Sequence, residues 1–240
     1  MHGRCSGCRI LFDSVATFQC ASDQTLLVYF ESQPSLHAHH QVVKLTRLLQ
    51  AEPIPGIRNL HPAYGSVLVK FNPLERTHHE LEAILASYLD RIENLPLPEP
   101  RHVEIPICYG GDFGPDLEDV AHLHNLTPAQ VVELHSSATY FVSFLGFVPG
   151  FAYLSGLPEV LATPRLDRPR RKVPAGTLGM GGTHTGIYPF STPGGWRLIG
   201  RTPVQMFQPD RADMSRLSIG DRVHFTPISE EQFSARGWDQ

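Results

Sequence analysis

A cluster of positive charges lies within residues 140–202, the stretch of the sequence richest in chemically useful side chains. Arg165, Arg168, Arg170, Arg171 and Lys172 follow one another closely there. A guanidinium group can form two parallel hydrogen bonds with a carboxylate or a phosphate, so the cluster suits an anionic ligand. The alternative is a solvated basic loop, an interpretation that applies most to Arg168 and Arg171.

Glycine is dense in the same stretch. Backbone N–H groups in glycine-rich turns can donate to a developing oxyanion, and glycine allows the backbone conformations that such turns need. The alternative is that these residues only satisfy the turns themselves. The candidates are Gly176, Gly179, Gly181, Gly182, Gly194 and Gly195.

Aromatic side chains accompany the glycines, which distinguishes this stretch from a flexible linker. They could line a pocket, or they could fill the interior of a β structure. Phe147 and Phe151 flank the expected turn at Pro149 and Gly150, and an exposed aromatic rim there would suit a protein partner. The aromatic candidates are Phe144, Phe147, Phe151, Tyr153, Tyr188 and Trp196.

Two histidines are candidates for acid–base chemistry. His135 lies near the end of an expected helix, where it could act as a base or orient one, or simply interact favourably with the helix C-terminus. His184 lies among the glycine-rich segments. The remaining candidates, on helices of the first domain, lack nearby acids or cysteines, so we expect no metal site. They are His37, His39, His40, His78 and His79.

The cysteines predict no disulfide framework. Cys5 and Cys8 have the spacing of half a zinc site or a redox pair, but no second cysteine pair follows them. Two free thiols in a terminal tail are the favoured interpretation. The N-terminal residues also lack the apolar core of a signal peptide, so we expect a cytoplasmic chain.

The elements expected in the first hundred residues form a βαββα pattern. Residues 25–30 indicate a strand, 35–51 a helix with Ser35 as N-cap, 57–71 two strands, and 74–92 a second helix. This pattern predicts a small α+β sandwich, roughly ferredoxin-like, over residues 1–98. The proline-rich segment from Leu95 to Pro100 indicates a stiff linker that ends this domain.

Residues 99–240 predict an all-β barrel with two short helices. Expected strands are residues 103–109, 139–144, 204–207 and 222–228. Expected helices cover about 114–124 and 127–136, the second opened by a capping box at Thr127 with proline at the first helical position.

Composition excludes some classes of function. The chain has 240 residues, 41% of them hydrophobic and 18% charged, with a net charge of −4. This balance gives no electrostatic case for nucleic acid binding. The sequence contains no apolar run long enough to span a bilayer, so we expect no membrane association.

The barrel region resembles a known family. The carrying segments are GFVPGFAYLSGLP, PRLDRPRRKVPAGTLGMGG, TGIYP and STPGGWRLIGRTP, with GGDFGPDLEDVA and VVELHSSATYFVSFLGF before them. They resemble the B subunit of 5-oxoprolinase, a family also called allophanate hydrolase subunit 1 or KipI-type. The match covers about residues 102–227. It implies a cyclophilin-like barrel behind a small α/β domain, and it departs at His184, where the family pattern has glutamine.

The resemblance implies three functions. The first is one component of an ATP-dependent 5-oxoprolinase, which opens 5-oxo-L-proline to L-glutamate together with a C subunit and an A subunit of the LamB/YcsF type. The second is a KipI-like inhibitor of a sporulation histidine kinase. The third is a carboxyltransferase or allophanate-hydrolase-type subunit, although the sequence contains no biotin-attachment segment. We predict the first, with the chain inactive alone.

The predicted reaction assigns roles to the candidate residues. Arg165 and Arg170 lie in the two Pro-Arg dipeptides of the family pattern, and with His135 they are the catalytic candidates. Aromatic and glycine residues would bind the substrate. ATP is expected in the assembled complex, and the sequence has no GxxxxGK[ST] phosphate-binding loop. The substrate-binding candidates are Phe147, Phe151, Tyr153, Gly176, Gly181, Gly182, Tyr188, Gly194, Gly195 and Trp196.

Overall fold

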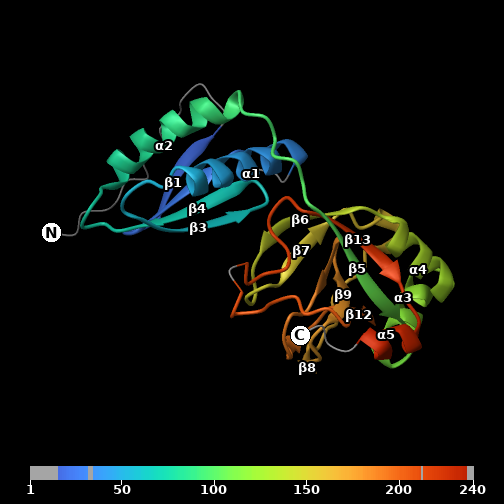
Figure 1. Cartoon of the computed structure of the whole chain (residues 1–240). Helices are drawn as coiled ribbons and strands as arrows, with labels where there is room; N and C mark the ends of the chain where they lie inside the picture. The colour runs from blue at the N-terminus through green and yellow to red at the C-terminus, as the bar shows by residue number, and fades with distance from the viewer. Residues whose placement is uncertain (1–15, 32–34, 212, 237–240) are drawn as a thin grey trace. The chain divides into compact units, whose positions relative to one another are not determined.

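The chain forms two compact units, Met1–Glu99 and Pro100–Gln240 (Figure 1). The structure, a computed structural model, describes residues 16–31, 35–211 and 213–236. Cys5 and Cys8 lie outside the described residues, so the interpretation of that pair stays a prediction. Of the other two cysteines, Cys20 is exposed and Cys108 is buried.

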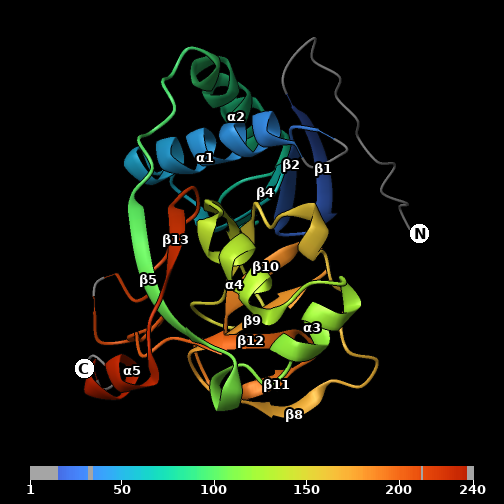
Figure 2. The same ribbon diagram turned by 90° about the vertical axis from the view of Figure 1, so that its right-hand side faces the viewer.

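The first unit is an antiparallel sheet with both helices on one face (Figures 1 and 2). Its four strands run in the order β1-β2-β4-β3. Successive strands pair antiparallel throughout. The elements are β1 (Thr17–Ser22), β2 (Thr25–Tyr29), α1 (Leu36–Ala51), β3 (Ile57–Ala63), β4 (Ser66–Phe71) and α2 (His78–Glu93).

Alternation along the strands explains this packing. Leu26 and Val28 of β2 are buried, as are Val67 and Val69 of β4, while their neighbours are less buried. Ser35 caps α1 by accepting from the N–H of Ala38, as expected. The five expected elements are present, although α2 begins at His78 and not at Leu74, and the βαββα pattern was incomplete because β1 precedes it. The ferredoxin-like classification stays a prediction.

The second unit is a closed barrel of seven strands, ordered β6-β13-β5-β12-β9-β10-β7, and β6 pairs with β7 to close it. All pairings that are described in it are antiparallel except β13 with β5, the last and first strands, which run parallel. A separate ribbon pairs β8 with β11. The strands are β5 (His102–Tyr109), β6 (Tyr140–Leu145), β7 (Ala152–Ser155), β8 (Arg170–Val173), β9 (Thr177–Gly181), β10 (His184–Ile187), β11 (Thr192–Gly194), β12 (Arg197–Arg201) and β13 (Arg222–Pro227).

Helices cover part of the barrel. α3 (Leu117–Leu123) and α4 (Pro128–Ser137) pack together, and α4 also contacts β13 (Figure 2). Thr127 and Gln130 form the expected capping box of α4. A third helix, α5 (Glu230–Arg236), was not predicted, so the count of two short helices was too low.

Two strand predictions in the barrel need correction. Residues 204–207 form no strand and contribute a single bridge, Phe207 with Ser215. Conversely, the glycine-rich stretch carries β7 to β12, which were not predicted individually. They have three to five residues each, too few for a clear alternation between glycines and prolines.

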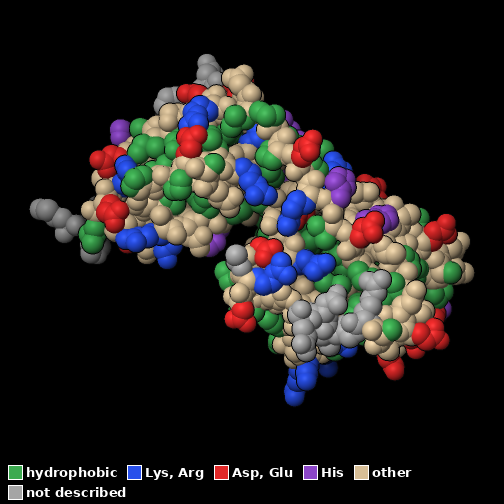
Figure 3. Space-filling view, in the orientation of Figure 1, with side chains coloured by type: hydrophobic (Ala, Val, Ile, Leu, Met, Phe, Trp, Pro, Cys, Tyr) green, Lys and Arg blue, Asp and Glu red, His purple; other side chains and the backbone are tan. Residues whose placement is uncertain are grey.

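The surface mixes charges of both signs, as the face in Figure 3 shows. A large positive field attracts polyanions such as nucleic acid, and on this face acidic side chains lie among the basic ones. In the described ranges, no helix combines the length and the apolar character that crossing a bilayer requires.

Candidate functional site

A cavity of about 300 Å³ opens in the barrel unit between the β8–β11 ribbon and the loop that precedes β7. Among the described residues that line it, Arg165 carries the only charge, and the others are aromatic, proline, glycine or leucine. The lining residues are Phe147, Phe151, Tyr153, Arg165, Leu166, Pro169, Tyr188, Pro193, Gly194, Gly195 and Trp196.

The aromatic walls of the cavity pack edge to face. The ring of Phe151 lies 5.3 Å from that of Tyr188 and 5.4 Å from that of Trp196, with interplanar angles of 72° and 77°. Phe151, Tyr188 and Trp196 are buried, and they share a small apolar cluster with Val173 and Leu198. This arrangement fixes the walls before any ligand binds.

Phe147 stands on the rim of the cavity. Its side chain is 58% exposed, and its φ of 69° lies in the left-handed region, which is strained for a bulky residue. Strain of this kind concentrates at functional sites. The ring still contacts the walls, because its centroid lies 5.6 Å from that of Phe151.

Charges near the cavity act on its titratable groups. Burial raises the pKa of Tyr188, and a hydrogen bond from the backbone of Trp196 and the charges of Arg165 and Arg170 offset part of that rise. Burial and the charge of Arg165 lower the pKa of His184. Neutral phenol and imidazole groups therefore lie near the Arg165 guanidinium.

Eight sequence-predicted site residues meet in this cavity. Gly176, Gly181 and Gly182 do not line it, although Gly181 supports its wall. A Cβ atom at Gly181 would lie 2.5 Å from Nε1 of Trp196, so only glycine fits there. The eight are Phe147, Phe151, Tyr153, Arg165, Tyr188, Gly194, Gly195 and Trp196.

Arg170, a catalytic candidate, is used for a structural contact. Its Nη2 lies 2.6 Å from Oδ1 of Asp116, a carboxylate with a side chain 5% exposed. The cavity lining does not include Arg170. The structure thus separates the two arginines that the sequence grouped, with Arg165 at the cavity and Arg170 behind it.

His135, the other catalytic candidate, is fully buried in the barrel and lies outside the cavity lining. Its Nδ1 is 2.9 Å from the hydroxyl of Tyr109, and its Nε2 is 3.1 Å from Oγ1 of Thr185. Thr185 donates to the carbonyl of Gly179, so its oxygen accepts from Nε2–H of His135. Burial lowers the pKa of His135 to about 3, which keeps the ring neutral. These contacts favour the buried, satisfied histidine over the base.

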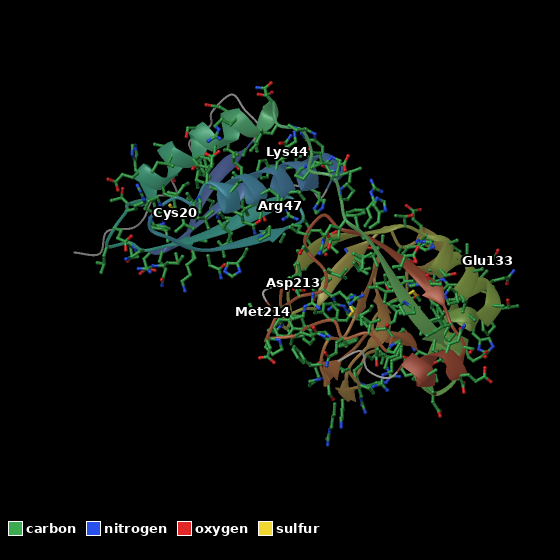
Figure 4. The ribbon with its side chains drawn as sticks, viewed as in Figure 1. Cys20, Lys44, Arg47, Glu133, Asp213 and Met214 are labelled. Atoms are coloured by element: carbon green, nitrogen blue, oxygen red, sulfur yellow. The ribbon has the colours of Figure 1, made fainter. Side chains whose placement is uncertain are left out.

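A second hollow of about 230 Å³ is lined by Arg101, Arg211 and Arg216, with Asp213 and Met214 beside them (Figure 4). Arg101 is ion-paired with Asp221, and Arg211 with Asp213. Two of the three arginines of this hollow are thus ion-paired, whereas none of the ion pairs found among the described residues includes Arg216. Within the described residues, no group of three or more histidine, cysteine or acidic side chains is arranged to hold a metal ion.

Comparison with known proteins places the chain in a family. Residues 16–217 match the family described as "Carboxyltransferase domain, subdomain C and D". The 5-oxoprolinase B subunit of Bacillus subtilis is 37% identical over 227 residues, covering 89% of this chain and 93% of that protein. The 5-oxoprolinase B subunit of Escherichia coli O157:H7 is 48% identical, covering 75% and 78%. The chain belongs to the family of 5-oxoprolinase B subunits.

Two solved structures are also similar to the chain. The crystal structure of TTHA0988 superposes with a TM-score of 0.76 at 33% identity, covering 86% of this chain and 40% of that one. The chain therefore spans about two fifths of that longer protein. The structure of PH0987 from Pyrococcus horikoshii, 42% identical, covers 90% of this chain and 99% of its own, with a TM-score of 0.54.

Several residues of the candidate site were not predicted from the sequence. Leu166, Pro169 and Pro193 complete the cavity, and Asp116 fixes Arg170 from behind. Pro169 lies between the noted arginines, so its position was a usable signal. Asp116 offered none, because its partner is 54 residues away in the chain.

Proposed function

We propose that the chain is the B subunit of an ATP-dependent 5-oxoprolinase and that the aromatic cavity binds 5-oxo-L-proline. The observation that carries the proposal is one guanidinium, that of Arg165, on an otherwise uncharged aromatic cavity. The substrate has the matching character, a small lactam ring with one carboxylate. The names of the relatives from Bacillus subtilis and Escherichia coli support the assignment of the reaction.

Each part of the substrate has a partner in the proposed complex. The carboxylate takes two parallel hydrogen bonds from Arg165. The ring packs against Phe151 and Trp196, which already hold each other in place. The volume of about 300 Å³ is at the small end of ligand pockets, which suits a compact ligand. The lactam carbonyl lies toward the surface, where a partner protein completes the site.

The proposal assigns ATP to the assembled complex. ATP supplies the phosphoryl group that activates the lactam carbonyl, which is otherwise a poor electrophile. The sequence has no GxxxxGK[ST] phosphate-binding loop, and two of the three arginines of the second hollow, Arg101 and Arg211, are already ion-paired. We therefore propose that the partners, a 5-oxoprolinase C subunit and a LamB/YcsF-type A subunit, are needed for ATP use and that this chain is inactive alone.

The test is glutamate release from 5-oxo-L-proline and ATP by the three proteins together, with each omitted in turn. We expect activity only when this chain is present. Activity that persists without it would contradict the proposal, and binding to a histidine kinase would then be measured for the KipI-like alternative.

Arg165→Ala is predicted to lower kcat/KM for 5-oxo-L-proline by more than about tenfold, because the carboxylate loses its charged partner. Arg168→Ala is the matched control, an exposed arginine of the same loop outside the cavity lining. Steady-state kinetics of the three-protein mixture measure both. Equal activity of the two variants would show that Arg165 does not bind the substrate.

A further inference from the structure

Asp116 is a buried carboxylate in the GGDFGPDLEDVA segment, and the proposed function gives it no role. It is 4% exposed. It occupies the N-cap position of α3, where an aspartate usually accepts a hydrogen bond from the helix, yet it forms no side-chain cap bond. Its two carboxylate oxygens serve other elements instead.

Both oxygens hold strands of the barrel unit. Oδ2 accepts from the backbone N–H of Leu198 on β12 at 2.6 Å, and Oδ1 accepts from Arg170 on β8 at 2.6 Å. The backbone N–H of Asp116 also donates to the carbonyl of Leu198 at 2.9 Å. Asp116 is therefore hydrogen-bonded to β12 through its backbone N–H and Oδ2, and to β8 through Oδ1.

The segment before Asp116 lies tightly against β12. A Cβ atom at Gly114 would lie 2.1 Å from the carbonyl oxygen of Ile199, so only glycine allows this approach. The approach brings the Asp116 carboxylate within reach of Leu198. The glycine and the aspartate of this segment thus form one contact with β12.

Both strands that Asp116 holds continue into the walls of the cavity. Leu198 belongs to the apolar cluster of Phe151 and Trp196. Arg170 follows Pro169 and pairs across the ribbon with Gly194, and both of these residues line the cavity. A shift at Asp116 would therefore move lining residues on both elements.

We propose that Asp116 is a positioning residue: through Arg170 and Leu198 it holds the β8–β11 ribbon and Trp196 at the separation that the ligand requires. The identity of that ligand rests on the proposed function, whereas the positioning does not. Arg170 acts in this role as the partner of Asp116 and not as a ligand for the substrate. The residues touch no substrate themselves, so they influence binding through the cavity walls.

Asp116→Asn and Arg170→Met test the proposal in the three-protein mixture. We expect each to raise KM for 5-oxo-L-proline about tenfold with kcat within about threefold of the unchanged complex. The double variant should be no worse than the more impaired single one, because both changes break the same ion pair. If Asp116→Asn does not fold, the KM values of Arg170→Met and Arg170→Lys test the proposal in its place.

Asp221→Asn is the matched control. Asp221 is a second buried carboxylate, 1% exposed, that accepts from the backbone of Ser218 and pairs with Arg101. Neither contact reaches the cavity lining. We expect Asp221→Asn to lose about as much thermal stability as Asp116→Asn, while its KM for 5-oxo-L-proline stays unchanged. A rise in KM equal to that of Asp116→Asn would overturn the proposal, as would unchanged KM values in Asp116→Asn and Arg170→Met.

A readout without activity separates this proposal from the proposed function. Trp196 and Trp238 are the two tryptophans of the sequence, so Trp238→Phe leaves Trp196 as the fluorophore of the full chain. In that background, Asp116→Asn should raise acrylamide quenching of Trp196 at least about twofold, and Asp221→Asn should not. This result would stand even if the mixture released no glutamate. Equal quenching in the two variants would overturn the positioning role.

Discussion

The protonation state of a histidine in this protein follows from its burial and hydrogen bonds. His135 is enclosed between the hydroxyl groups of Tyr109 and Thr185, which fix one neutral tautomer. Charging the ring would bury a cation without a counter-ion, which is costly. His184 is half-buried, and burial together with the charge of Arg165 lowers its pKa. Of these two, only His184 combines partial exposure with proximity to the cavity.

The stability of the barrel unit should fall with acid because of His135. Its pKa is about 3 when folded and about 6.5 when exposed, so the unfolded chain binds the extra proton between these values. The free energy of unfolding then decreases as pH falls below 6.5, by up to about 1.4 kcal/mol per pH unit from this residue. Urea unfolding at several pH values between 7.5 and 4.5 measures the slope.

His135→Gln isolates the contribution of this histidine. Glutamine keeps a donor and an acceptor but does not titrate, so the variant should be less stable at neutral pH yet lose less stability on acidification. His39→Gln is a control in the first unit, where burial lowers the pKa of His39 to about 4. An unchanged pH slope in His135→Gln would refute the assignment.

At the scale of elements, the cavity depends on very short strands packed against aromatic rings. β9 brings Gly181 against Trp196, and β11 brings Gly194 against the hydroxyl of Tyr188. Because glycine has no side chain, the rings of Trp196 and Tyr188 fit against Gly181 and Gly194. The glycines predicted as oxyanion donors are thus explained at these two positions by close packing.

Gly181→Ala should displace Trp196. The added Cβ would lie 2.5 Å from the indole Nε1, and overpacking of this kind costs about 1–3 kcal/mol. Gly195→Ala is the control in the same cavity, because its Cβ would lie at an ordinary 3.6 Å from Pro169. Thermal unfolding and near-ultraviolet circular dichroism compare them. Equal stability of the two variants would mean that Trp196 can be displaced without a loss of thermal stability.

Elements with a regular pattern could be predicted, and contacts between distant residues could not. α1 followed from apolar periodicity and its Ser35 cap, α2 from periodicity alone, and α4 from its capping box. Arg165 and the aromatic residues were found because their side-chain types suit a ligand. The partners of Arg170 and His135 lie 54 and 26 residues away, so folding alone reveals that one is ion-paired and the other satisfied.

At the scale of the whole molecule, each unit has the means to fold by itself. The barrel closes through β6 and β7 and encloses its own buried core. We predict that residues 100–240 expressed alone unfold cooperatively in urea, with near-ultraviolet circular dichroism like that of the barrel in the full chain. A fragment without a cooperative transition would show that the barrel depends on the first unit.

The position of β13 has a consequence for protein synthesis. Among the described strands β13 comes last in the sequence, yet it lies between β5 and β6, two of the first strands of the barrel. Until Arg222–Pro227 has left the ribosome, both of those strands have an unpaired edge. The first unit can fold during translation, whereas the barrel can close only after β13 has become available. Before that point the open edges of β5 and β6 are exposed to edge-to-edge association between nascent chains.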